Sequence, residues 1–186
     1  MGGDKTLEVE IRPLEAEELA TVEEQWPRPT GTHEQRLLAQ QLGIAVYLFA
    51  WWSTEAVGHL LIRWTGASQP VIRSRWPQVP YLVDVMVKEA WRRRGVGTRL
   101  LVEAEALARA RGASAVGLSV GVGNEGALRL YRRLGYREVG VPPYSLTWPL
   151  VMADGGEQWI EEVCLYLQKS LVAGSGFWLS QRIEGS

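Results

Sequence analysis

Residues 81–111 restrict the fold more than any other part of the sequence, because a strand, a glycine-containing loop and a long helix follow one another there. Residues 81–87 read YLVDVMV, which predicts a mostly buried strand. A helix is expected from the loop to about Arg111, with Gly112 as its stop. Its apolar face would be formed by Leu100, Ala104, Leu107 and Ala108, with Glu103, Glu105 and Arg109 on other faces.

The loop, residues 88–97 with the sequence KEAWRRRGVG, is suited to hold an anion. Phosphate groups bind where backbone N–H groups converge at the start of a helix. Gly95 and Gly97 leave room for close approach, and Arg92, Arg93 and Arg94 supply charged donors. The alternative interpretation is a turn with its arginines in water. Because the glycines coincide with a helix start after an apolar strand, we favour the anion site.

The rest of the chain predicts a mixed sheet with helices on its faces, in one α/β domain over residues 1–186. Strands are expected at 7–14, 47–52, 57–64, 114–120, 136–141 and 161–168, and helices at 15–26, from residue 32, and at 127–135. Thr32 and Gln35 have capping-box spacing, and the helix after them would bury Leu37, Leu38 and Leu42. Residues 65–80, with three prolines, predict a loop, and residues 172–186 a C-terminal tail.

Composition excludes several classes of function. Lys and Arg number 20 against 21 Asp and Glu, so no basic field predicts a nucleic-acid partner. A single cysteine, Cys164, excludes an internal disulfide, and with only two histidines we expect no metal site. The sequence has no apolar run of membrane-spanning length, and MGGDKTLEVE does not resemble a signal peptide, so no membrane partner and a cytoplasmic location are expected. A homodimer is left open.

Residues 121–126 match the pattern G-x-G-x-x-G between a predicted strand and a predicted helix. This context, with Glu138 downstream, is that of a dinucleotide-binding fold. The helix is short, however, Glu138 lies within its own strand, and too little chain follows for further strand–helix–strand units. We therefore keep dinucleotide binding only as a distant alternative.

Residues 81–138 resemble the GNAT superfamily of acyl-CoA-dependent N-acyltransferases. The signature (Arg/Gln)-x-x-Gly-x-(Gly/Ala) is matched by residues 92–97, and the strand before it by residues 85–87. The second half of the family pattern is matched by residues 124–131 and 134–136, which read NEGALRLY and LGY. The resemblance implies a GNAT-like fold, a mostly antiparallel twisted sheet with splayed parallel strands and flanking helices.

The resemblance also implies the residues of the site. Coenzyme A would place its pyrophosphate on the backbone amides from Arg93 to Thr98, and its pantetheine arm would run along the strand before them. Asn124 would bond the arm from the opposite side, and Tyr131 would donate a proton to the leaving thiolate as the catalytic residue. A backbone N–H near Val85 would stabilise the oxyanion. The cofactor-binding set is Val85, Met86, Val87, Arg92, Arg93, Arg94, Gly95, Val96, Gly97, Thr98 and Asn124, with no metal ligands.

The function implied is an N-acetyltransferase that uses acetyl-CoA to acetylate a primary amine of a small-molecule or peptide acceptor. The general base is not assigned. Some relatives have a glutamate where this chain has Ser119, and strand alternation turns Asp84 away from Tyr81, Val83 and Val85 unless a bulge re-aims it. The missing glutamate keeps one alternative open, a non-catalytic acyl-CoA-binding or regulatory module.

Other reactive or aromatic residues are interpreted as structural. Cys164 lies in an alternating strand without a nearby histidine, which favours a buried thiol over a nucleophile. We expect His59 to be a residue of a strand face. For four tryptophans we keep two interpretations, packing in the core and lining an acceptor pocket. These are Trp51, Trp52, Trp64 and Trp76.

Overall fold

A single mixed sheet organises the protein, as the computed structural model shows for residues 9–152 and 156–172. Its strand order is β1-β2-β3-β4-β5-β8-β6, and β7 also pairs with β8. The strands are β1 (Glu10–Pro13), β2 (Ala45–Trp52), β3 (Glu55–Arg63), β4 (Tyr81–Val87), β5 (Ala115–Gly121), β6 (Arg137–Glu138), β7 (Tyr144–Val151) and β8 (Glu157–Ser170). The helices are α1 (Leu19–Gln25), α2 (Thr32–Gln41), α3 (Pro70–Arg73), α4 (Val96–Ala110) and α5 (Glu125–Arg133), with 3-10 turns at Ala16–Glu18 and Glu89–Trp91.

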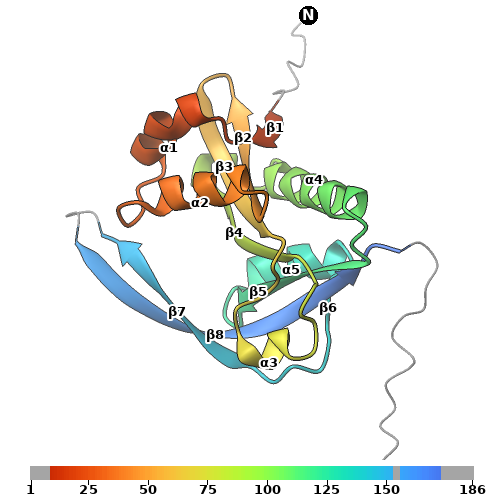
Figure 1. Ribbon diagram of the computed structural model, residues 1–186. Coiled ribbons are helices and arrows are strands. Elements are labelled where there is room, and N and C mark those ends of the chain that lie inside the picture. Colours follow the sequence, from red (N-terminus) through yellow and green to blue (C-terminus); the bar gives the residue numbers. More distant parts are fainter. Residues whose placement is uncertain (1–8, 153–155, 173–186) are drawn as a thin grey trace, which may run out of the picture.

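Helices cover both faces of the strands β2 to β4 (Figure 1). On one face α4 packs with α5 over an aliphatic core that includes Leu60, Leu100 and Leu118. On the other face α1 and α2 enclose a second, aromatic-rich core with Tyr47 and Phe49. The predicted α/β architecture with a mixed sheet is therefore confirmed, because each strand here contributes side chains to cores on both faces.

The strands β4 and β5 are parallel neighbours, but they pair over only a short length. Tyr81 and Leu82 of β4 pair with Gly117 and Leu118 of β5, and no further pair joins the two strands. Both strands continue for several residues beyond this point. The edge of β4 that faces β5 is consequently open from Val83 onward.

A β-bulge bends β4 where the two strands separate. The register shifts between His59 and Leu61 of β3, so that Asp84 and Val85 of β4 lie opposite Leu60 alone. Asp84 has φ of 55°, in the left-handed region that few residues other than glycine adopt. Such a bulge turns the strand and re-aims its side chains.

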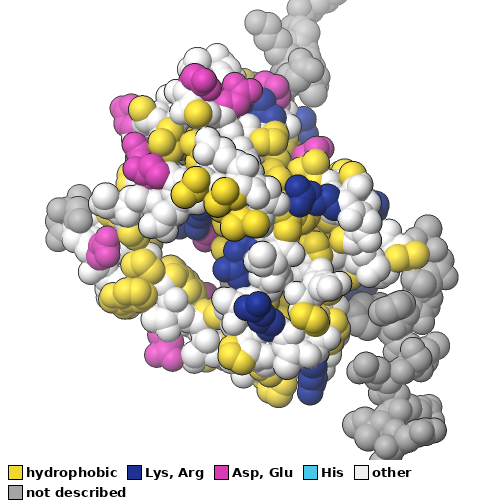
Figure 2. Space-filling view, in the orientation of Figure 1, with side chains coloured by type: hydrophobic (Ala, Val, Ile, Leu, Met, Phe, Trp, Pro, Cys, Tyr) yellow, Lys and Arg dark blue, Asp and Glu magenta, His cyan; other side chains and the backbone are white. Residues whose placement is uncertain are grey.

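The hairpin β7–β8 extends away from the body of the molecule (Figure 1). The second half of β8, from Cys164 to Ser170, pairs with β5, whereas its first half pairs only with β7. The hairpin thus faces α1 and α2 across an open space, which the space-filling view also shows (Figure 2).

Several local predictions are wrong. Helix α2 begins after Gly31, which has φ of 80°, and the Thr32 hydroxyl donates to the carbonyl of Pro29 rather than closing a capping box. Only Leu37 of the three leucines predicted to be buried is buried, with His33 one turn before it, whereas Leu38 and Leu42 are exposed. Residues spaced by four positions share a helix face, and adjacent ones do not.

The side of α4 that carries Glu105 is also buried, contrary to expectation. The Glu105 carboxylate accepts hydrogen bonds from the Tyr136 hydroxyl at 3.1 Å and from Lys169 at 2.6 Å, which compensate for its burial.

Three differences concern whole segments. The predicted loop 65–80 contains the short helix α3, and the strand β7 was not expected. The strand at 81–87 has its predicted bounds but is fully buried only at its first two residues, because β5 leaves it there. The predicted tail lies outside the described residues except for Val172. In the described ranges no helix is both long and apolar enough to cross a membrane.

Gly58 lets α4 approach β3 closely, and we predict that Gly58→Ala lowers the free energy of unfolding by about 1–3 kcal/mol. A Cβ at this position would lie 2.9 Å from the Met86 carbonyl oxygen and 3.2 Å from Leu100. The control is Gly123→Ala, because nothing lies within 4 Å of the added methyl group. Urea denaturation of both variants tests this, and equal stabilities would show that α4 accommodates the methyl group.

Candidate active site

The N-terminus of α4 presents a row of unused backbone donors. The first hydrogen bond of this helix runs from the Arg99 N–H to the Gly95 carbonyl at 3.0 Å. In the described structure the N–H groups of residues 93–98 donate to no other protein group. Left-handed conformations at Arg93, with φ of 59°, and Gly95, with φ of 83°, form the turn that exposes these groups. The positive end of the helix dipole adds to their attraction for an anion.

The two loop glycines keep the space above these donors free. A Cβ on Gly95 would meet nothing within 4 Å, so the surface there is open. A Cβ on Gly97 would lie 3.6 Å from Leu130 of α5 and 3.7 Å from Val87 of β4. Gly97 therefore lies between the strand and α5, where a larger side chain would project into the row of donors.

The three arginines before the glycines have different environments. The Arg92 Nε donates to the Val87 carbonyl at 3.2 Å, and the Arg94 guanidinium lies 5.4 Å from the centre of the Trp91 ring. Arg93 is exposed. All three side chains are exposed at the same end of α4 as the free backbone amides.

The open edge of β4 leads from this row of amides toward the bulge. Val85 and Val87 pack against the core under α4, whereas the Met86 side chain is 39% exposed on the opposite face. The backbone from Val83 to Val87 is thus paired with β3 on one side and with no strand on the other, where the Val87 carbonyl accepts from the Arg92 Nε. An extended ligand could pair with it as an added strand would.

Helix α5 brings Asn124 and Tyr131 to the same region. Asn124 caps the helix, since its side-chain oxygen accepts from the Ala127 N–H at 3.1 Å, and its amide group remains available as a donor. Tyr131 is buried beside Tyr136, and burial raises the pKa of its phenol to about 12. Within the described residues no hydrogen bond involves the Tyr131 hydroxyl. It can therefore give its proton to a ligand.

The bulge re-aims Asp84, so strict alternation is wrong for this residue. Its carboxylate faces α2 and pairs with Arg36 at 2.5 Å and with Arg28 at 3.3 Å. Burial acts to raise the pKa of Asp84, but the charges of Arg36 and Arg28 outweigh it and hold the pKa below its usual value. Asp84 is consequently a weak base that keeps its negative charge.

The imidazoles beside this cluster are neutral. Burial, followed by the charge of Arg28, lowers the pKa of His59 well below its usual value. Burial also lowers the pKa of His33, whose Nδ1 lies 3.1 Å from the Tyr47 hydroxyl. His59 is fully buried on its strand, as expected. The cluster therefore owes its charge to the arginines and to Asp84.

Ser119, at the position where the family resemblance implies a glutamate in some members, takes part in a cluster of hydroxyl groups. Its hydroxyl lies between those of Tyr81 and Tyr144 and hydrogen-bonds to both. Burial raises the pKa of both phenols, so the three hydroxyl groups stay protonated. Cys164 is buried nearby, and burial raises the pKa of its thiol to about 11, which fits the structural role predicted for it.

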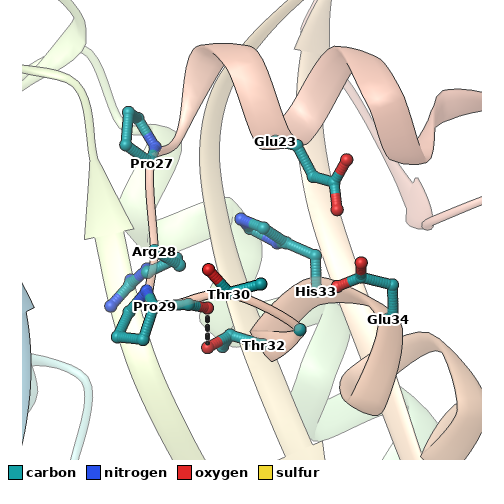
Figure 3. Close-up of a pocket in the computed structure, with 9 residues that line it drawn as sticks. Glu23, Pro27, Arg28, Pro29, Thr30, Thr32, His33 and Glu34 are labelled. Carbon is teal, nitrogen blue, oxygen red and sulfur yellow. Dashed lines mark hydrogen bonds between the residues drawn. The ribbon is translucent and has the colours of Figure 1, made fainter. Parts of the chain in front are cut away.

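Two hollows lie on the α1–α2 side of the sheet. One, of about 340 Å³, lies between α2, β3 and β4 and reaches Arg36, Arg63 and Val83. The other, of about 240 Å³, lies at the connection between α1 and α2, where Glu23 and Glu34 approach from the two helices (Figure 3). Figure 2 shows dark blue Lys or Arg side chains along the opening between the α1–α2 layer and the hairpin. None of the four tryptophans considered for a pocket lines either hollow.

Comparison with known proteins identifies the fold. The model of the acetyltransferase (GNAT) family matches residues 11–136. The chain belongs to the GNAT family. Residues matched by the family model include the anion site, the open edge of β4 and Tyr131, so the resemblance seen in residues 81–138 is confirmed.

Two curated relatives match this GNAT chain over shorter stretches. The chain is 40% identical over 78 residues to GCN5-related N-acetyltransferase 4, chloroplastic, of Arabidopsis thaliana, which is 42% of this chain and 26% of that protein. It is 41% identical over 61 residues to an uncharacterized N-acetyltransferase of Methanocaldococcus jannaschii, which is 33% of this chain and 27% of that protein. The matches thus span about a quarter of the length of these relatives.

Solved structures show the same fold. The PaiA N-acetyltransferase of Thermoplasma acidophilum, in complex with coenzyme A, has a TM-score of 0.60 and 16% identity, covering 88% of this chain and 99% of that chain. The putative acetyltransferase YncA of Salmonella typhimurium, with acetyl-CoA, has a TM-score of 0.61 and 20% identity, covering 90% and 96%. This topology leaves no room for the dinucleotide-binding alternative, because the strand after α5 has only two residues and is antiparallel to β8.

Sequence reasoning missed the charged cluster. Arg28, Arg36 and Arg63 lie in a loop, a helix and a strand, and none belongs to a recognisable motif. The one available signal was Asp84, an acid within an apolar strand, which had to have a partner if it was buried.

The ion pairs of Asp84 should make folding stability depend on pH. The pKa of Asp84 is lower in the folded state than in the unfolded state, where it is about 3.9. The stabilisation from its ion pairs is therefore fully present above the unfolded pKa and is lost as the pH falls through the folded pKa. We predict that Asp84→Asn, which tolerates the same φ, lowers the free energy of unfolding by about 1–3 kcal/mol at neutral pH. The difference in free energy of unfolding between the native protein and Asp84→Asn should become smaller as the pH is lowered to about 3.

Urea denaturation at several pH values measures this effect. Glu125→Gln is the control, because its ion pair with Arg129 is exposed and should be worth less than about 0.5 kcal/mol. A difference between the native protein and Asp84→Asn that stays constant with pH would contradict the assignment.

Proposed function

We propose that this protein is an N-acetyltransferase that transfers the acetyl group of acetyl-CoA to a primary amine. The observation that carries the proposal is the row of unpartnered amides at residues 93–98, which continues into the open edge of β4. A ligand that fits must be anionic at one end and extended at the other. Coenzyme A, with a pyrophosphate and a pantetheine arm, has this form.

The residues present fit acetyl-CoA along its length. The amides from Arg93 to Thr98 would bind the pyrophosphate, with Arg92 and Arg94 at the rim. The backbone of β4 from Val85 to Val87 would pair with the pantetheine arm, and the side-chain amide of Asn124 would donate to it from α5. The bulge at Asp84 bends β4 where the arm would end.

Acetyl-CoA supplies an acyl group activated as a thioester, and the protein supplies the rest. A backbone N–H near Val85, on the open edge, would donate to the carbonyl oxygen as negative charge develops there. Tyr131 would protonate the departing sulfur, since its phenol is protonated and has no competing hydrogen bond within the described residues. The hollow beside Arg36 and Val83, on the opposite face of β4, would admit the amine.

The proposed reaction does not need a charged side chain beside the amine as its general base. Asp84 is held by two arginines and His59 is fully buried, so we assign the role to neither. The amine would arrive neutral or lose its proton to solvent through the open hollow. The rate should therefore rise with pH as the amine deprotonates.

The row of amides is tested by Gly97→Glu. At about 100 times its Kd, coenzyme A should stabilise the native protein by about 2.7 kcal/mol. A glutamate here would bring its own carboxylate to the helix N-terminus, so the variant should fold and bind coenzyme A at least ~100-fold more weakly. Thermal unfolding and titration calorimetry measure both quantities.

Gly97→Ala is the control for this variant. The added methyl group would make only ordinary contacts with Leu130 and Val87, so binding should weaken by less than ~10-fold. If Gly97→Glu still bound coenzyme A with native affinity, the cofactor site would lie elsewhere.

The role of Tyr131 is tested by Tyr131→Phe. We predict a fall in kcat by about 10²–10⁴ with unchanged affinity for coenzyme A, because only the proton donor is lost. Since the pKa of Tyr131 is about 12, the native rate should show no loss near pH 10, where an ordinary phenol ionises. Steady-state release of free thiol measures the rate.

Tyr136→Phe separates chemistry from structure. It removes a buried hydroxyl that donates to Glu105, so it should lower stability and leave kcat largely intact. A native-like kcat in Tyr131→Phe would remove the residue from the mechanism. Binding of coenzyme A without thiol release across a broad panel of amines would favour the non-catalytic binding module.

A further inference from the structure

The hollow between α2, β3 and β4 has the place expected of an acceptor pocket. It reaches Val83, the last residue of β4 before the bulge, and its volume of about 340 Å³ suits a small molecule or the end of a larger one. Its lining includes the arginines Arg36 and Arg63 and the apolar residues Leu61 and Ile44. Its occupant should therefore have an anionic group and an apolar group.

Arg63 is the unusual member of this lining. Its side chain donates one hydrogen bond, from Nη2 to the Gly66 carbonyl at 3.2 Å, and its guanidinium lies 5.2 Å from the centre of the Tyr81 ring. Its Nε is buried without a partner. Throughout residues 9–152 and 156–172, no ion pair includes Arg63. A half-buried guanidinium without a carboxylate is costly unless a ligand completes it.

The charges around the pocket do not balance. Arg28 and Arg36 share the single carboxylate of Asp84, and Arg63 has none. The neighbouring imidazoles of His33 and His59 are buried and neutral. The pocket itself is lined by two guanidinium-bearing residues, Arg36 and Arg63, of which only Arg36 has a carboxylate partner within the described residues. In a partly dry hollow this surplus of positive charge attracts an anion.

We propose that the acceptor is a small amine that also carries a carboxylate, an amino acid or a close equivalent, and that Arg63 binds this carboxylate. The proposal rests on the proposed acetyltransferase function and specifies its substrate class. The amine would lie near Val83, and the side chain of the acceptor against Leu61 and Ile44.

The spacing along β4 agrees with this assignment. Arg63 is the register partner of Tyr81, and Leu61 is the partner of Val83. Two residues of a strand span ~7 Å. An amino acid places its carboxyl carbon ~2.5 Å from its nitrogen, and a charge-assisted hydrogen bond adds ~2.8 Å. The carboxylate can therefore reach Arg63 while the amine stays close to Val83.

The test compares acceptors that differ only in the carboxylate. Leucine, leucinamide and isoamylamine share a side chain and a primary amine, and equivalent series can be made with alanine and phenylalanine. Thiol release from acetyl-CoA is measured across pH for each compound. Because amidation lowers the pKa of the amine itself, kcat/KM is compared for the neutral amine. For at least one free amino acid, this kcat/KM should be at least ~10-fold higher than for its amide and for its decarboxylated analogue.

Variants of Arg63 assign the preference to this residue. Arg63→Gln should remove the preference by raising KM for the amino acid, while leaving the neutral analogues and the affinity for coenzyme A unchanged. Arg63→Lys should restore part of it, since the charge remains but the paired donors are lost. Arg73→Gln, a change at an exposed arginine of α3, is the control and should keep the preference.

The outcomes separate this inference from the proposed function. Failure to bind coenzyme A would remove the proposed function itself. Normal binding of coenzyme A with equal or faster turnover of the neutral analogues would overturn the inference alone, as would turnover of no amino acid in any series. An equal loss for all acceptors in Arg63→Gln would show that Arg63 supports the fold rather than the substrate.

Discussion

The ion pairs of Asp84 with Arg28 and Arg36 hold the bend in β4 on which the rest of the site depends. A left-handed residue other than glycine costs about 1–2 kcal/mol. Here the two guanidinium groups offset that cost, because they can pair with the carboxylate only when the bulge turns it toward α2. The same bend separates β4 from β5 and opens its edge. Ion pairs on one face of the sheet thus help to keep the two strands apart.

The row of free backbone amides at the start of α4 could be predicted from sequence because all of its determinants are local. The strand at 81–87, the glycines at 95 and 97 and the helix after them occupy one continuous stretch, and the free amides follow from helix geometry alone. Asn124 and Tyr131 were also predictable, since one turn pattern and one helix place them on α5. The limit of such reasoning appears within the same strand. The bulge puts Asp84 on the face of Val83 and turns Val85 and Val87 to the opposite face, against strict alternation.

The charged cluster on the α2 side of β4 could not be predicted, because its residues meet only through tertiary structure. Arg28, Arg36, Arg63 and Asp84 come from four segments, and a bulge is not visible in a pattern of apolar residues. The prediction for Glu105 was wrong for a similar reason, since the partner that compensates for its burial, Lys169, lies more than sixty positions later in the chain. Buried charges are thus the positions where local pattern reasoning is weakest, because their partners decide their environment.

The hairpin β7–β8 has an evolutionary consequence. Its outer half pairs with no strand of the sheet other than its own partner, so its length can change without disturbing β4, β5 or α4. Insertions or deletions there would reshape the wall opposite α1 and α2 while the amides at the start of α4 stay fixed. Descendants of one such chain could therefore vary this wall by altering a single hairpin, while the start of α4 stays the same.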